Sequence, residues 1–197
     1  MARSERAALG LSIHTGWAAC VAASGTLRAP RIVARERIEL LPDPDRFVFH
    51  RAAELTPAAA ERAVALARRA AIARGTAALK RVLTDLRAGG CDPVACAIVA
   101  KDGAMPASLA DIVGAHPRIH TAEGAFYRDV AGSAAEANGL PTRVVPPGQI
   151  DRLAVAAMRM EPSQVATLLA QAGRAAGRPW AKDQKLAALA AWTVLAG

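Results

Sequence analysis

The chain has 197 residues, 53% of them hydrophobic, and a formal net charge of +8 with a pI near 10.4. This length and apolar content predict one substantial core and a single domain over residues 1–197. Residues 1–10 lack the apolar run of a secretory signal, and the apolar tail 186–196 is far shorter than the roughly 20 residues that cross a bilayer. We therefore expect a cytoplasmic protein with no membrane partner.

The positive charge suits an anionic partner such as DNA or RNA, because clustered basic side chains attract phosphates and release counterions on binding. All but four of the 25 basic residues are arginine, in a chain rich in alanine. A GC-rich coding sequence produces the same bias. The charge therefore leaves nucleic-acid contact open rather than predicting it.

The three cysteines, Cys20, Cys91 and Cys96, contain no CxxC pair and no cysteine–histidine cluster of zinc-finger spacing. We interpret them as reduced and mostly buried thiols. The sequence predicts no metal site and no cofactor.

Two short apolar runs near the start of the chain predict a β-hairpin. They cover residues 7–13 and 17–23, and His14-Thr15-Gly16 separates them. After a bend at Pro30, β-branched residues over 31–41 predict a third antiparallel strand.

A loop rich in proline and aspartate is expected over 42–55, where Phe47 and Phe49 would anchor it on the core. Thr56-Pro57 then supplies an N-cap and a first-turn proline for a long helix that ends near Gly89-Gly90.

The basic residues of this long helix are spaced so that they stack along one flank. They are Arg62, Arg69, Lys80 and Arg87. The ordinary interpretation is a solvated helix edge, and the alternative is a ridge that follows nucleic-acid phosphates.

The second half of the chain begins with a continuous apolar run over 94–100, typical of a strand buried on both faces. The elements predicted after it are helices over 106–115 and 121–138, a strand over 142–145, and helices over 147–159, 161–173 and 182–195. Thr121 and Gly139 are taken as the cap and the stop of the second of these helices.

This order indicates an α/β fold with a mixed sheet, three antiparallel strands then parallel strands, and helices on both faces. Four segments carry a family resemblance in the same order: Leu9–Gly16, Gly124–Ala137 with Gly139-Leu140-Pro141, Met160–Val165, and Asp183 with 186–191. Together they resemble the ribonuclease-H-like superfamily, and within it the RuvC-type Holliday-junction resolvases.

The chain departs from that family at the residues that the resemblance implies should be acidic. Where the nucleases place an aspartate on the first strand and a glutamate on the buried strand, this chain has Ser12 and Val99. The terminal helix has Asp183, with Leu186 at the second acidic place. Magnesium demands near-octahedral oxygen ligation, so two-metal cleavage is not expected, although Asp102 leaves a single-ion site open.

Polar residues where strands and helices of this layout end are candidates for other chemistry, because open mixed sheets bind ligands there. The candidate catalytic residues are Ser12, His14, His120, Glu123 and Asp183. His120 and Glu123 lie about one helical turn apart, and pairs of this kind serve as acid and base or as metal ligands. His50 and Glu54 have a similar i, i+4 spacing. Helix caps and surface partners are the structural alternative for these side chains.

Three functions remain open from the sequence. The first is a RuvC-like, nucleic-acid-associated domain that lacks conventional two-metal nuclease activity, a pseudo-nuclease. The second is a small-molecule or phosphate-handling enzyme that uses a His/Glu/Asp cleft. The third is a structural or regulatory subunit that forms a homodimer or binds a protein partner. Whether the chain is an enzyme is left undecided.

Overall fold

A computed structural model describes residues 4–101, 103–105 and 108–196. The strands are β1 Glu5–His14, β2 Trp17–Thr26, β3 Ala29–Glu39, β4 Cys91–Val99 and β5 Thr142–Val145. The helices are α1 Val48–Ala52, α2 Pro57–Ala88, α3 Leu109–Val113, α4 His116–Glu136, η1 Pro147–Gln149, α5 Ile150–Met158, α6 Pro162–Ala176 and α7 Lys182–Leu195.

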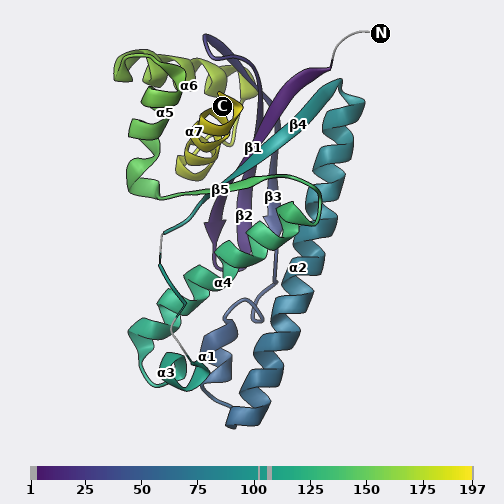
Figure 1. Cartoon of the computed structure of the whole chain (residues 1–197), viewed down its shortest axis with the longest axis vertical. Coiled ribbons are helices and arrows are strands. Elements are labelled where there is room, and N and C mark those ends of the chain that lie inside the picture. Colours follow the sequence, from purple (N-terminus) through teal and green to yellow (C-terminus); the bar gives the residue numbers. More distant parts are fainter. Residues whose placement is uncertain (1–3, 102, 106–107, 197) are drawn as a thin grey trace.

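The strands form one sheet in the order β3-β2-β1-β4-β5 (Figure 1). β2 is antiparallel to β1 and β3, whereas β4 is parallel to β1 and β5. The predicted mixed sheet of three antiparallel strands followed by parallel strands is confirmed. Its parallel arrangement places the carboxyl ends of β1, β4 and β5 at one edge.

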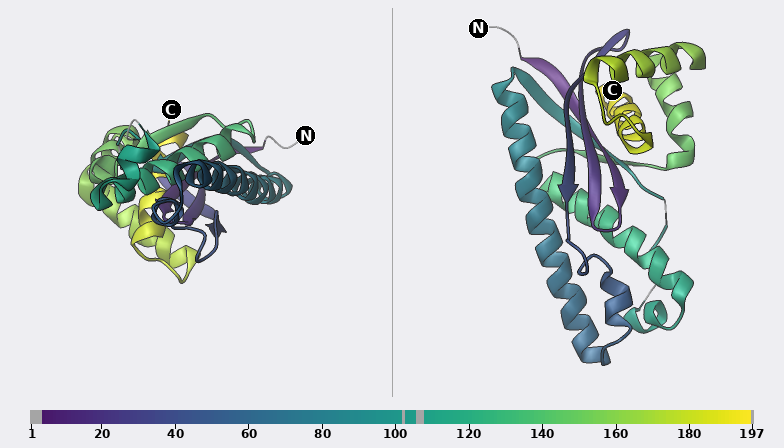
Figure 2. Two further views of the ribbon diagram at one scale, coloured as in Figure 1. Left: turned by 90° about the horizontal axis from the view of Figure 1, so that it is seen from below. Right: turned by 180° about the vertical axis from the view of Figure 1, so that it is seen from behind.

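Helices cover both faces of the sheet, as Figure 2 shows from behind. β1 alternates between the two cores: Leu9 and Leu11 belong to the core under α2 and α4, and Ser12 lies on the other face with Val99. On that second face α7 packs very close to β1. A Cβ atom built on Gly10 would overlap the carbonyl oxygen of Ala187 in α7. The absence of a side chain at Gly10 therefore permits the close contact of strand and helix.

α2 runs along the sheet and past its carboxyl edge, where α1 and α3 lie near its first turns (Figure 1). The long helix predicted from Thr56-Pro57 is confirmed, with Thr56 as its N-cap. Among the described residues, no helix combines the length and the apolar character needed to cross a membrane.

Several predicted element bounds were wrong. The hairpin strands are longer than expected and Pro30 lies inside β3, paired with Gly25, so the third strand runs over 29–39 rather than 31–41. The expected loop 42–55 contains α1, in which Phe49 is buried, whereas Phe47 is 37% exposed.

The start predicted for the helix over 121–138, which corresponds to α4, was wrong. α4 begins at His116 rather than Thr121, because Pro117 occupies its first turn, where a missing backbone N–H costs no hydrogen bond. His120 and Thr121 are therefore inside the helix and not at its cap. α3 covers only Leu109–Val113 of the expected 106–115, of which 106 and 107 lie outside the described residues.

Candidate functional site

A cleft of about 920 Å³ lies at the carboxyl edge of the sheet, between α4 and α7. Its walls come from the ends of β1 and β4, the start of η1, the middle of α4 and the first turns of α7. The polar residues that line it are Ser12, His14, Thr15, Lys101, His120, Thr121, Tyr127, Arg128, Lys182 and Asp183. Ligands of open sheets bind at this kind of edge.

Four cleft residues occupy the places where the family resemblance implies acids. The register of β1 on β4 pairs Ser12 with Val99, so their side chains point to the same face of the sheet. Asp183 and Leu186 of α7 line the same cleft. The structure therefore brings all four positions together, and among them only Asp183 is acidic.

Asp183 links α7 to the end of β1. Its Oδ1 accepts a hydrogen bond from Nε2 of His14 at 2.8 Å, and one from Oγ of Ser12 at 3.4 Å. His14 is stacked on Trp17 with ring centroids 4.3 Å apart, and the guanidinium of Arg37 lies 3.9 Å from the centroid of the same indole. Stacking on Trp17 therefore restrains the His14 ring beside Asp183.

The order of these hydrogen bonds limits the chemistry of Ser12. In a serine nucleophile site the histidine lies between serine and carboxylate and takes the serine proton. Here Asp183 is the shared acceptor of Ser12 and His14. Asp183 therefore positions both side chains, and these three residues do not have the bonding order that activates a serine.

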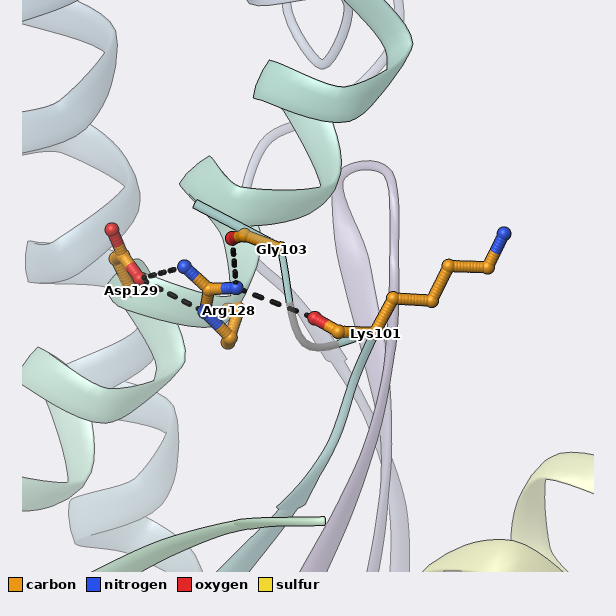
Figure 3. Close-up of polar contacts among 4 residues, drawn as sticks. All are labelled: Lys101, Gly103, Arg128 and Asp129. Atoms are coloured by element: carbon orange, nitrogen blue, oxygen red, sulfur yellow. Dashed lines mark hydrogen bonds and ion pairs between the residues drawn. The ribbon is translucent and has the colours of Figure 1, made fainter. Parts of the chain in front are cut away.

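Arg128 of α4 fixes the segment that follows β4 (Figure 3). Its Nη1 donates to the carbonyl oxygens of Lys101, at 3.3 Å, and Gly103, at 2.6 Å. Nε and Nη2 donate to Oδ1 of Asp129, at 3.1 and 3.0 Å. The Lys101 side chain extends away from these contacts, whereas Asp102 lies outside the described residues.

A two-magnesium centre of the kind implied by the resemblance does not fit the donors that line this cleft. In the described part of the chain, Asp183 is the only carboxylate among the lining residues. The side chains of Val99 and Leu186 have no donor atoms, and one carboxylate with the hydroxyls of Ser12, Thr15 and Thr121 supplies too few oxygen ligands for two hard cations.

The structure separates His120 from Glu123. His120 lines the cleft, while Glu123 is 3% exposed and accepts a hydrogen bond from Nδ1 of His50 at 2.9 Å. Of the candidate catalytic residues, Ser12, His14, His120 and Asp183 therefore share one cleft and Glu123 does not. His50 bonds to Glu123 rather than to the expected neighbour Glu54, which follows the end of α1.

Sequence reasoning missed a histidine cluster on the far side of His120. His50, His116 and His120 place one ring nitrogen each within 4.8 Å of the others. The i, i+4 spacing of His116 and His120 was the available signal. It was not recognised because both residues were placed outside the helix that in fact holds them.

Burial removes three other groups from acid–base or ligand chemistry. It raises the pKa of the Cys96 thiol to about 12 and the pKa of Cys20 further. Burial, together with the charge of Glu123, also raises the pKa of Tyr127, whose hydroxyl donates to the backbone oxygen of Arg46 at 2.6 Å. All three side chains stay protonated at neutral pH, in agreement with the reduced, buried thiols expected from the sequence.

The basic flank of α2 is separate from the cleft. Its four side chains, Arg62, Arg69, Lys80 and Arg87, are exposed, and none of them lines the cleft. α2 packs on the face of the sheet opposite α7.

No protein-family model and no curated protein matches the chain. Solved structures do match. T. thermophilus RuvC in complex with a Holliday junction substrate aligns with a TM-score of 0.55 and 16% identity over 95% of this chain and 91% of that chain. A second Thermus thermophilus RuvC structure gives 0.51 and 13%, over 95% and 92%. The chain therefore has a ribonuclease-H-like fold similar to that of RuvC, and the predicted resemblance is confirmed.

Proposed function

We propose that this RuvC-like chain binds nucleic acid in the cleft between α4 and α7 and does not cleave it by the two-metal route. One observation carries the proposal: Ser12 and Val99 lie side by side at the cleft and face Asp183 and Leu186, so a single carboxylate stands where several are needed. The fold resembles that of RuvC, while the side chains at three of these four positions are not carboxylates.

The charge of the cleft favours a polyanion. Lys101 and Lys182 line it, against Asp183 as the one acid among the described lining residues, while the charge of Arg128 is paired with Asp129. Cations gathered in a cleft raise the local concentration of phosphates and speed association. The net charge of +8 adds the same attraction at longer range.

The similar RuvC structure bound to a Holliday junction indicates which DNA to test first. Fluorescence anisotropy with a four-way junction, a duplex and a single strand, at 50 to 200 mM salt, measures affinity and its salt dependence. We expect binding that weakens linearly on a log–log plot as salt rises, and no Mg²⁺-dependent cutting of the same labelled DNA. Absence of binding at the lowest salt would end the proposal, and Mg²⁺-dependent cutting would end its second half.

Two lysines of α7 provide a matched pair of variants. Lys182 lines the cleft, whereas Lys185 lines a different groove beside Trp180. We expect Lys182→Ala to reduce the salt slope by about 0.9, the value for one lost phosphate contact, and Lys185→Ala to leave it unchanged. Equal effects of the two substitutions would place the DNA elsewhere.

A small-molecule enzyme is the second candidate, because the cleft volume lies in the range of ligand pockets and His14, His120 and Asp183 reach it together. A thermal-shift screen with nucleotides and phosphorylated metabolites tests this function, since a ligand that binds only the folded state raises the Tm. Stabilisation by such a compound that His14→Ala removes would favour an enzyme over a nucleic-acid-binding domain.

A further inference from the structure

We propose that His50, His116 and His120 form a binding site for a divalent transition metal, with Zn²⁺ as the expected ion. The three side chains come from two elements, α1 and α4, and their nearest ligand nitrogens lie within 4.8 Å of one another. His116 and His120 are one helical turn apart, so both face α1, where His50 is.

The rings are oriented so that they can surround an ion. All three pairs meet edge to face, at 77° for His50 and His116, 65° for His50 and His120, and 88° for His116 and His120. Nitrogens bound to one tetrahedral zinc at about 2.0–2.1 Å are roughly 3.3 Å apart. Binding would therefore require side-chain rotation to close the remaining distance, and the two side chains that would rotate, His116 and His120, are exposed.

Glu123 supports the site through a hydrogen bond to His50. Its Oε1 lies 2.9 Å from Nδ1 of His50, and its side chain is only 4% exposed. A buried carboxylate is costly unless it is paired, and here its hydrogen-bond partner is a histidine of the cluster. The bond fixes the His50 tautomer and leaves Nε2 to bind the metal, which is the arrangement of carboxylate–histidine–zinc sites.

The donor set selects the ion. Imidazole nitrogens suit Zn²⁺, Ni²⁺ and Cu²⁺, whereas Mg²⁺ and Ca²⁺ prefer oxygen ligands. Three protein ligands leave the fourth tetrahedral position for water, which is the pattern of zinc sites that keep an exchangeable ligand. Because His120 also lines the cleft, the bound ion would sit at its wall. This site is separate from Asp183 and does not depend on nucleic-acid binding.

Zinc titration of the whole chain, stripped with a chelator and followed by calorimetry and by competition with a chromophoric chelator, tests the site. We expect one Zn²⁺ per chain, and affinity weakened by about 100-fold or more in His116→Ala and in His120→Ala, since each loses a ligand. His14→Ala, the remaining histidine of the chain, is the matched control and should keep the wild-type affinity within about threefold. Equal affinity in His14→Ala and His120→Ala, or no binding by the wild type, would overturn the proposal.

Glu123→Gln tests the positioning role of the carboxylate. We expect zinc affinity to fall about 10- to 100-fold while circular dichroism shows an unchanged fold. With Co²⁺ as a spectroscopic probe, the wild type should show the intense visible bands of a tetrahedral ion, and His120→Ala should lose them. Octahedral Co²⁺ spectra in both, or Mg²⁺ competing equally with Zn²⁺, would contradict an imidazole site. None of these measurements contains DNA, so their failure leaves the nucleic-acid proposal standing.

Discussion

Asp183 shows how one side chain can organise a site without supplying its chemistry. One of its oxygens accepts hydrogen bonds from both His14 and Ser12, so the carboxylate links the start of α7 to the end of β1. In a cleft that binds a polyanion, the same charge is repulsive. A two-metal nuclease would need this carboxylate, whereas a nucleic-acid-binding cleft does not. The two roles therefore predict opposite effects of removing the negative charge of Asp183.

Asp183→Asn should therefore strengthen DNA binding about twofold to fivefold at low salt, because one negative charge is removed and the amide oxygen still accepts hydrogen bonds. Anisotropy with the four-way junction measures this change. Asp151→Asn, on the exposed surface of α5, is the control and should have a smaller effect. Loss of binding in Asp183→Asn would contradict the proposed role of the cleft.

The buried Cys96 thiol makes stability depend on alkaline pH. Its pKa rises from 9.0 to about 12 on burial, so above pH 9 the unfolded chain holds fewer protons than the folded chain. The free energy of unfolding must then fall as pH rises from about 9 to about 12, by at most about 1.4 kcal/mol per pH unit for this thiol. Below pH 9 both states are protonated and the effect vanishes.

Urea unfolding under reducing conditions, at pH 8 and pH 10.5, checks this prediction. Between these pH values the wild type should lose about 1–2 kcal/mol more than Cys96→Ala, which has no thiol to ionise at this position. Identical pH dependence of the two proteins would show that Cys96 is accessible to solvent.

Among the elements, α7 and β1 depend most on small residues at their contact. Gly10 faces the backbone of α7 at Ala187, and the helix presents further buried alanines to the sheet. This close approach is what brings Asp183 within hydrogen-bond distance of His14. The composition of these two elements therefore determines the geometry of the cleft.

Gly10→Ala should destabilise the protein by about 1–3 kcal/mol or more, because the added methyl overlaps backbone atoms that cannot rotate away. Gly132→Ala in α4 is the matched substitution. Its Cβ would meet only Ile98 Cδ1, at 3.9 Å, and alanine is the better helix former, so we expect a gain of about 0.5–1 kcal/mol. Equal stability of the two variants in urea would refute the described contact of β1 and α7.

At the scale of the whole molecule, two groups of basic side chains are compared as surfaces for nucleic acid, those of the cleft and those of the outer flank of α2. The flank extends over roughly 38 Å at 1.5 Å per residue from Arg62 to Arg87, long enough to follow about one turn of DNA. We interpret it as a solvated edge, because α2 lies on the face of the sheet opposite α7 and its basic side chains do not line the cleft.

Replacing the four basic residues of this flank with glutamine tests the interpretation. If the flank held phosphates, the log–log salt slope would fall by about three to four, whereas a solvated edge predicts a change below about one. Glutamine keeps the helix propensity of α2, so thermal unfolding should change little. A large loss of slope would move the proposed nucleic-acid surface from the cleft to α2.

Binding to a second copy or to a protein partner stays a prediction of the sequence. Light scattering coupled to size exclusion measures it directly.

Local patterns were enough to predict the order of the strands and of the helices other than α1 and η1. The apolar runs near His14-Thr15-Gly16, the Thr56-Pro57 helix start and the apolar run of β4 each depend on neighbours in sequence. They also placed Ser12, Val99 and Asp183 correctly at the ends of their elements. The predicted start of α4 was wrong because Pro117 was interpreted as the end of the preceding helix, whereas it lies in the first turn of α4.

The contacts between distant residues could not be read in the same way. That Glu123 turns from His120 to His50, and that His50 meets His116 and His120, depends on how α1 packs against α4. The periodicity of a sequence predicts which face of a helix or strand is apolar. The hydrogen-bond partner of a polar side chain depends instead on which other element packs beside it in the folded core. The sequence by itself therefore determined the fold and which residues stand at Ser12, Val99, Asp183 and Leu186, and the packing of the helices decided which polar residues meet.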